Sequence, residues 1–162
     1  MARSRLERRG LPGPRLAAFM AGAAVMRAAA FRAVGGSAAH LFLGAEEMLM
    51  SLDLAARGWE IVYASDVVTH HRPSPSRDPR GRAICEARNR IWIACMRMPA
   101  ADVWRTAAQA LSASKSHGLL APTVWSTLRG LPIALARRRV VRAEVQQMWR
   151  EVFLRGDDAV FE

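Results

Sequence analysis

The sequence changes character near residue 80, and this change constrains the fold more than any other feature. Three prolines, Pro73, Pro75 and Pro79, predict a rigid polar loop between two unlike parts of the chain. Before the loop, short apolar runs alternate with glycines, which indicates mixed helices and strands. After it, apolar residues recur at helical spacing and arginines are frequent. We therefore expect an α/β part followed by an arginine-rich helical tail.

Short apolar runs in the first part predict strands over residues 60–64 and 67–71, and the small apolar run over 16–26 suits a buried strand or a close-packed backbone. Helices are predicted over residues 28–34 and 46–57. The second helix has the clearer pattern, because Met48, Leu49 and Leu52 fall on one face and Gly58 ends it.

The tail is expected to be helical throughout. Its predicted helices cover residues 83–98, 101–112, 123–137 and 142–154. Pro99 ends the first of them, and Gly130 and Pro132 are expected to kink the third.

The net charge of +10 and the isoelectric point near 11.5 suit an anionic partner. Nearly all of this charge is arginine, because Lys115 is the single lysine. A composition bias that favours arginine and alanine explains the charge equally well. Such a partner would be nucleic acid, a phosphorylated substrate or an anionic membrane surface.

The two cysteines, Cys85 and Cys95, lie ten residues apart in one predicted helix and so point to different faces. No C-x-x-C motif is present, which argues against a structural zinc site. No apolar run approaches the ~18 residues of a membrane span. We expect a protein of the reducing cytoplasm.

Several motifs occur in a characteristic order. They are R-A-A-A-F-R-A-V-G-G over 27–36, an acidic pair that opens a helix in 44–64, V-V-T-H-H over 67–71 and A-R-N-R-I-W over 87–92. In this order and spacing the chain resembles the C-terminal half of a family 2 inverting glycosyltransferase. The resemblance covers about residues 19–99.

The resemblance implies an α/β fold, the C-terminal portion of a glycosyltransferase A-type (Rossmann-like) fold. It implies three regions: a flexible basic lead-in over 1–15, the acceptor-side part of the catalytic domain over 16–99, and a helical tail over 100–162 that suits a membrane surface. The implied reaction transfers a sugar from a nucleotide-diphospho donor to a hydroxyl acceptor of a cell-envelope glycan or glycolipid.

An inverting transfer needs a general base that removes the proton of the acceptor hydroxyl. The resemblance places this base on Glu47 and its partner, or an acceptor hydrogen bond, on Glu46. Three positions depart from the family pattern: Glu47 stands where an aspartate is commoner, Leu49 replaces a frequent aspartate, and Asp53 replaces a frequent arginine. The alternative is that both glutamates only complement the dipole at a helix N-terminus.

The resemblance further implies that His70 contacts a metal or the donor diphosphate. His71, Arg77 and Arg88 are weaker candidates for phosphate or acceptor contacts, since arginine offers a fork of donors to phosphate oxygens. The alternatives are half-exposed loop histidines and a solvated basic face.

A complete enzyme of this family is expected to hold Mg or Mn against the diphosphate with an Asp-x-Asp motif. The sequence has no such motif, and its first aspartate is Asp53. We expect the donor-binding half to be absent and the chain to be inactive alone. It is then either a fragment of a longer gene or a stand-alone remnant.

Two other functions stay open. A basic nucleic-acid-binding module fits the charge, although no recognised nucleic-acid-binding signature is present. A membrane-surface module, peripheral at the inner face of the membrane, fits the tail. The residues that suggest it are Trp104, Trp125, Trp149, Arg137, Arg138, Arg139 and Arg142.

Overall fold

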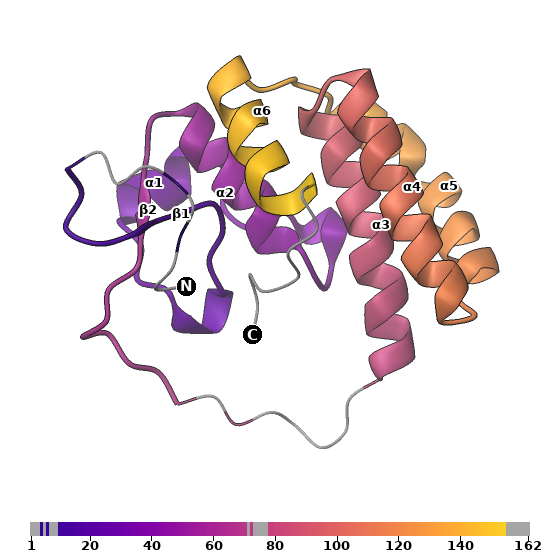
Figure 1. Cartoon of the computed structure of the whole chain (residues 1–162), viewed down its shortest axis with the longest axis horizontal. Helices are drawn as coiled ribbons and strands as arrows, with labels where there is room; N and C mark the ends of the chain where they lie inside the picture. The colour runs from indigo at the N-terminus through magenta and orange to yellow at the C-terminus, as the bar shows by residue number, and fades with distance from the viewer. Residues whose placement is uncertain (1–3, 5, 7–9, 71, 73–77, 155–162) are drawn as a thin grey trace. The chain divides into compact units, whose positions relative to one another are not determined.

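The computed structural model describes residues 4, 6, 10–70, 72 and 78–154 (Figure 1). The chain divides into two compact units. Unit 1 comprises residues 1–37, 47–73 and 142–162, and unit 2 comprises residues 38–46 and 74–141. The boundary near the acidic pair falls between Glu46 and Glu47.

The described residues are mainly helical, and the predicted α/β fold is wrong. About 62% of them lie in helices. The sheet that they form has two strands of two residues each, β1 (Arg15–Leu16) and β2 (Ile61–Val62), paired antiparallel. A Rossmann-like sheet is parallel and needs strands joined by helical crossovers. The glycosyltransferase A-type architecture is therefore not the fold of the described chain.

The predictions of strands over 16–26 and 67–71 are wrong for the described residues, apart from Leu16 in β1. After Leu16 the first segment leaves the ladder, and it contains a 3-10 turn, η1 (Ala21–Ala23). Residues 67–70 have no regular structure, and His71 lies outside the described residues. Apolar runs become strands only where neighbouring strands pair with them. Val25 and Val68 instead stay 89% and 71% exposed.

Unit 1 is built around two helices and the short ladder. They are α1 (Ala28–Ala33) and α2 (Glu46–Ala56), and α2 belongs to this unit from Glu47 onward. Arg15 is buried in β1 and its Nε lies 2.5 Å from Oε2 of Glu60. One buried cluster of this unit consists of Phe19, Ala30, Met50 and Leu54, with Met26, Val34, Trp59 and Ile61 packed against it.

The last described helix also belongs to unit 1. It is α6 (Ala143–Trp149), followed by a π-helical turn, η3 (Arg150–Leu154). Val145, Met148 and Trp149 are buried, and Arg142 donates from Nη2 to the carbonyl oxygen of Ala55 at 2.9 Å. The helix predicted over 142–154 is therefore present, with a change of helix type at Arg150.

Unit 2 contains a three-helix bundle, α3 (Pro79–Arg97), α4 (Ala100–Ser116) and α5 (Leu120–Ala136), which lie side by side in Figure 1. The three helices confirm the helical prediction for this part of the chain. The first begins four residues before its predicted start, because Asp78 caps it and Pro79 occupies its first turn. Asp78 Oδ1 accepts the Gly81 N–H at 2.9 Å.

Close packing of α3 on α5 depends on one glycine. A Cβ at Gly130 would lie 2.0 Å from Cζ2 of Trp92, so only glycine admits the indole ring here. The indole Nε1 donates to the carbonyl oxygen of Thr127 at 2.9 Å. The ring of Trp92 is thus buried with its polar atom satisfied, as is usual for a buried tryptophan. Among the described residues, no helix is long and apolar enough to cross a bilayer.

Candidate functional site

The acidic pair opens α2, as the sequence predicted. Both side chains are half-buried. Oε1 of Glu47 accepts the backbone N–H of Ala21 at 3.3 Å, a long hydrogen bond. Oε2 of Glu46 is buried and has no hydrogen-bond partner among the described residues. A buried carboxylate oxygen without a donor is unusual in a folded protein and marks a position where a donor would be favourable.

The loop that leads into the acidic pair is strained. Phe42 has φ 63° and ψ −74°, and the N–H of Leu43 donates back to the carbonyl oxygen of Leu41 at 2.9 Å. These values describe a γ-turn of the rare type with positive φ. Gly44 and Ala45 follow with φ 83° and 62°. Non-glycine residues in such conformations cost about 1–3 kcal/mol each and persist where surrounding contacts enforce them.

Asn89 of α3 supplies those contacts. Its side chain is completely buried, and Nδ2 lies 2.9, 3.0 and 2.6 Å from the carbonyl oxygens of Leu41, Leu43 and Gly44. One amide group therefore meets three acceptors of the strained loop. We call this arrangement the Asn89 clamp. The residue stands in the motif A-R-N-R-I-W, but its role as a clamp has no signal in the sequence alone.

Arg88 reinforces the same loop. Its Nη2 donates to the carbonyl oxygen of Leu41 at 2.9 Å, and its Nε lies 3.0 Å from Oδ1 of Asn89. The guanidinium also stacks over the ring of Trp92, 4.5 Å from the centroid. These contacts give Arg88 a role inside unit 2. Its contact with a phosphate stays a prediction.

The other predicted phosphate and metal contacts do not gather around a common point in the described chain. His70 is exposed, in a segment without regular structure. His71 and Arg77 lie outside the described residues. Across the part of the chain that the structure describes, no group of three or more His, Cys, Asp or Glu residues could hold a metal ion. The contact of His70 with a metal or a diphosphate stays a prediction.

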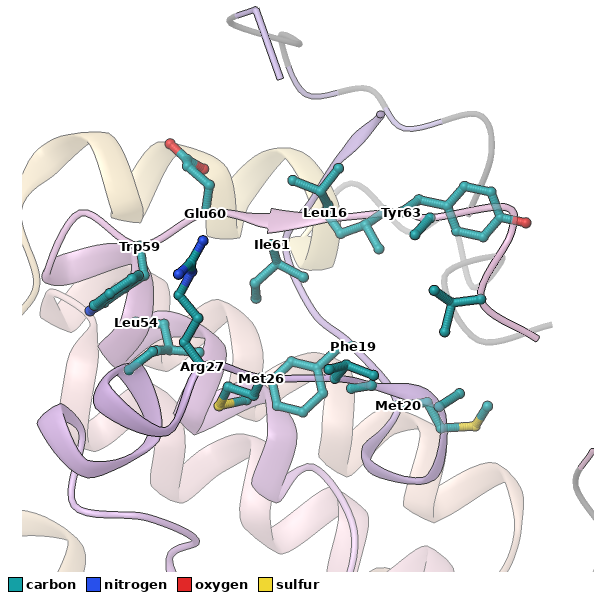
Figure 2. A pocket seen from close by; sticks show the side chains of 17 residues that line it. Leu16, Phe19, Met20, Met26, Arg27, Leu54, Trp59, Glu60, Ile61 and Tyr63 are labelled. Atoms are coloured by element: carbon teal, nitrogen blue, oxygen red, sulfur yellow. The ribbon is translucent and has the colours of Figure 1, made fainter. Parts of the chain in front are cut away.

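A cleft of about 410 Å³ lies within unit 1, between the segment that follows β1 and the segment that contains β2 (Figure 2). Its walls are mostly apolar, with Phe19 and Met26 on one side and Ile61 on the other. Figure 2 shows Arg27 pointing from the first segment toward Glu60. Met20, at the edge of the cleft, precedes the residue whose N–H meets Glu47. Glu47 itself does not line the cleft.

His40 lies beside the strained loop, in the short 3-10 turn η2 (Ala39–Leu41). Its Nε2 is buried and has no hydrogen-bond partner among the described residues. Burial lowers the pKa of this imidazole, and the positive charges of Arg137 and Arg97 lower it further. The neutral form is therefore favoured. Sequence reasoning assigned no role to His40, because nothing adjacent in the sequence pairs with it.

Two tryptophans of the predicted membrane-facing set are exposed and one is not. Trp104 and Trp125 are 77% and 69% exposed, whereas Trp149 is 1% exposed and belongs to the core of unit 1. Trp149 packs against Phe153, with ring centroids 4.9 Å apart. Trp149 is thus a core residue. The tryptophans of the predicted membrane-facing set that remain exposed are Trp104 of α4 and Trp125 of α5.

The candidate site is the acidic pair, whose carboxylate oxygens lie at the N-terminus of α2. The loop that precedes this helix is held by the Asn89 clamp. Such an arrangement can accept a proton or a hydrogen bond from a hydroxyl group. Comparison of the chain with protein-family models, with curated proteins and with solved structures finds no match.

Proposed function

We propose that this chain provides the acceptor side of a family 2 inverting glycosyltransferase. Glu47 is the general base, and Glu46 is its partner or accepts a hydrogen bond from the acceptor. As the acceptor oxygen bonds to the anomeric carbon, its proton passes to the Glu47 carboxylate. The bond to the nucleoside diphosphate breaks, and the diphosphate leaves with the electron pair.

One observation carries this proposal. The loop before the acidic pair has positive φ at Phe42, Gly44 and Ala45, and the Asn89 clamp holds it there. Backbone strain that is enforced by a buried polar side chain is a feature of sites where geometry matters for function. Oε2 of Glu46, which is buried and has no hydrogen-bond partner among the described residues, supports the proposal, because a shift of this oxygen to the surface would let an acceptor hydroxyl supply a donor. A purely structural helix N-terminus requires neither feature.

The proposal concerns the chemistry of the acidic pair and does not include the Rossmann-like architecture. The donor, a nucleotide-diphospho-sugar, is bound by groups that this sequence lacks, since it has no Asp-x-Asp motif. In the complete enzyme Mg or Mn belongs to that donor site, and His70 is the residue of this chain that we propose to contact the metal or the diphosphate. The acceptor is a cell-envelope glycan or glycolipid, and the protein acts at the inner face of the membrane. Alone, the chain is expected to release no nucleoside diphosphate from UDP-, GDP- or dTDP-sugars.

The test is deletion of the gene in its source organism, followed by mass spectrometry of envelope glycans and glycolipids. The proposal predicts that one glycan species is lost and that the wild-type gene restores it. Glu47→Gln should fail to restore it, because loss of a general base slows transfer by about 10²–10⁴. Asp66→Asn, which changes an exposed carboxylate in a turn, should restore it fully.

Protein levels of all variants are compared by immunoblot. Full restoration by Glu47→Gln at equal protein level would remove Glu47 from the mechanism. An unchanged glycan profile after deletion would overturn the transferase proposal as a whole. Turnover of a nucleotide sugar by the isolated chain would refute the assignment to the acceptor side.

The alternative is a basic binding module without catalysis, for nucleic acid or for a membrane surface. The exposed side chains of α5 favour a membrane surface over nucleic acid as the partner. Trp125 and Leu128 of this helix are 69% and 58% exposed. Large aliphatic side chains suit a lipid surface, whereas a phosphodiester backbone is bound mainly by cations.

A further inference from the structure

The helix α5 exposes most of its large apolar residues, and its four buried residues are small. The buried residues are Thr123, Thr127, Gly130 and Ala134, which follow one another at helical spacing on the side packed against the bundle. The large apolar side chains spread over the rest of the helix surface: Trp125 lies opposite the buried side, and Ile133 and Leu135 lie on its two flanks. Trp125, Leu128, Ile133 and Leu135 are 69%, 58%, 45% and 51% exposed. A helix of a water-soluble bundle normally has the reverse pattern.

We call these four exposed residues the α5 face. They spread along a helix of 17 residues, which is about 26 Å long. Arg129 is the one charged residue within this helix. Trp125 is suited to a membrane interface, since its ring is amphipathic. Exposed apolar side chains gathered on one helix indicate a surface that contacts another molecule.

Exposed arginines lie in α5 and just after it. Arg129 lies in the helix, and Arg137 and Arg139 follow its C-terminal end, all three with exposed side chains. No acidic side chain among the described residues forms an ion pair with any of the three. Arg138 differs, because its guanidinium donates to the carbonyl oxygens of Cys95 and Met98. Unpaired arginines beside an apolar face complement anionic lipid headgroups.

We propose that α5 is a docking surface for an anionic phospholipid bilayer, lying in the plane of the membrane with the α5 face inserted among the acyl chains. Arg129, Arg137 and Arg139 contact the lipid phosphates. Since α5 is not long enough to span a bilayer, the contact is interfacial. This surface is independent of glycosyl transfer, so its test needs no sugar substrate.

The experiment is co-sedimentation of the full chain with vesicles. One set contains phosphatidylcholine alone, and the other contains about 30% phosphatidylglycerol. The wild-type chain should bind the anionic vesicles at least tenfold more tightly, and raised salt should weaken this binding. The double variant Leu128→Gln/Ile133→Gln should bind at least tenfold more weakly, since two apolar side chains no longer insert.

A second double variant separates charge from insertion. Arg129→Gln/Arg137→Gln should lower affinity for anionic vesicles and leave the weak binding to neutral vesicles unchanged. Val68→Gln is the matched control, because Val68 is 71% exposed but lies in unit 1. It should bind as the wild type does. Circular dichroism verifies that each variant keeps its helix content.

Tryptophan fluorescence gives a measurement that needs no polar variant. Brominated acyl chains should quench the wild-type chain, and Trp125→Phe should lose a large part of that quenching. Equal binding to neutral and anionic vesicles would overturn the proposal, as would unchanged binding of Leu128→Gln/Ile133→Gln. A dimer that the α5 face variants dissociate, without vesicle binding, would reassign the face to a second copy of the chain. Salt-sensitive binding of a labelled oligonucleotide without vesicle binding would reassign the cations to nucleic acid.

Discussion

The side-chain amide of Asn89 lies 2.6 Å from the carbonyl oxygen of Gly44, two residues before the acidic pair that opens α2. The same nitrogen also meets the carbonyl oxygens of Leu41 and Leu43. Through these contacts α3 fixes the backbone conformation of the loop that precedes Glu46. Within unit 2, one buried polar residue thus links the helical bundle to the loop that precedes Glu46.

Replacing Asn89 should destabilise the chain strongly. Asn89→Leu leaves buried carbonyl oxygens without their donor, and each unsatisfied group costs about 1–3 kcal/mol. We expect a loss of about 2–4 kcal/mol in the free energy of unfolding, measured by urea denaturation. The control is Gln147→Leu, which changes an exposed position on α6 and should alter stability by less than about 0.5 kcal/mol. Equal effects of the two variants would contradict the clamp.

Gly130→Ala should disturb the packing of α3 on α5. The added Cβ would meet the indole of Trp92 at 2.0 Å, so the ring or the helix must move. Overpacking of this kind costs about 1–3 kcal/mol. Gly22→Ala is the matched control, because nothing lies within 4 Å of its Cβ position. Thermal unfolding should show a lower midpoint for the first variant alone, and an unchanged midpoint would refute this packing.

His40 should make stability depend on pH below neutrality. Its pKa in the folded chain is lowered from the usual 6.5 by burial and by Arg137 and Arg97. The unfolded chain therefore binds a proton more readily, so the contribution is present above pH 6.5 and is lost as the pH falls toward the folded pKa. Urea denaturation from pH 7.5 to 5.0 should show this loss. His40→Gln should flatten the profile over this range, and an identical slope in the variant would exclude His40 as its source.

The two thiols should differ in reactivity. Both cysteines are free and lie on α3, but Cys95 is buried whereas Cys85 is half-buried. Burial raises the pKa of the Cys95 thiol, which lowers the fraction of reactive thiolate. A thiol reagent should therefore modify one cysteine in the native chain and two in denaturant. Cys85→Ser should abolish the fast reaction, whereas its persistence in that variant would show that Cys95 is accessible.

The helices could be predicted from the sequence because their signals are local. Apolar periodicity and Gly58 identified α2, and the same periodicity identified the helices of unit 2. The first turn of α3 was also readable, since Asp78 and Pro79 form a typical N-terminal cap, although the prediction placed the start at Ala83. The acidic pair was found in the same way, at the start of a predictable helix.

The tertiary structure alone decided the rest. Residues 16–26 and 67–70 have apolar composition that suits strands, but a strand forms only with a partner, and the described chain pairs just Arg15–Leu16 with Ile61–Val62. The Asn89 clamp joins residues more than forty positions apart, so no local pattern could indicate it. The outward direction of the α5 face likewise depends on which side of the helix packs on α3. Local sequence thus determined the helices, whereas long-range pairing and packing determined the fold and the site.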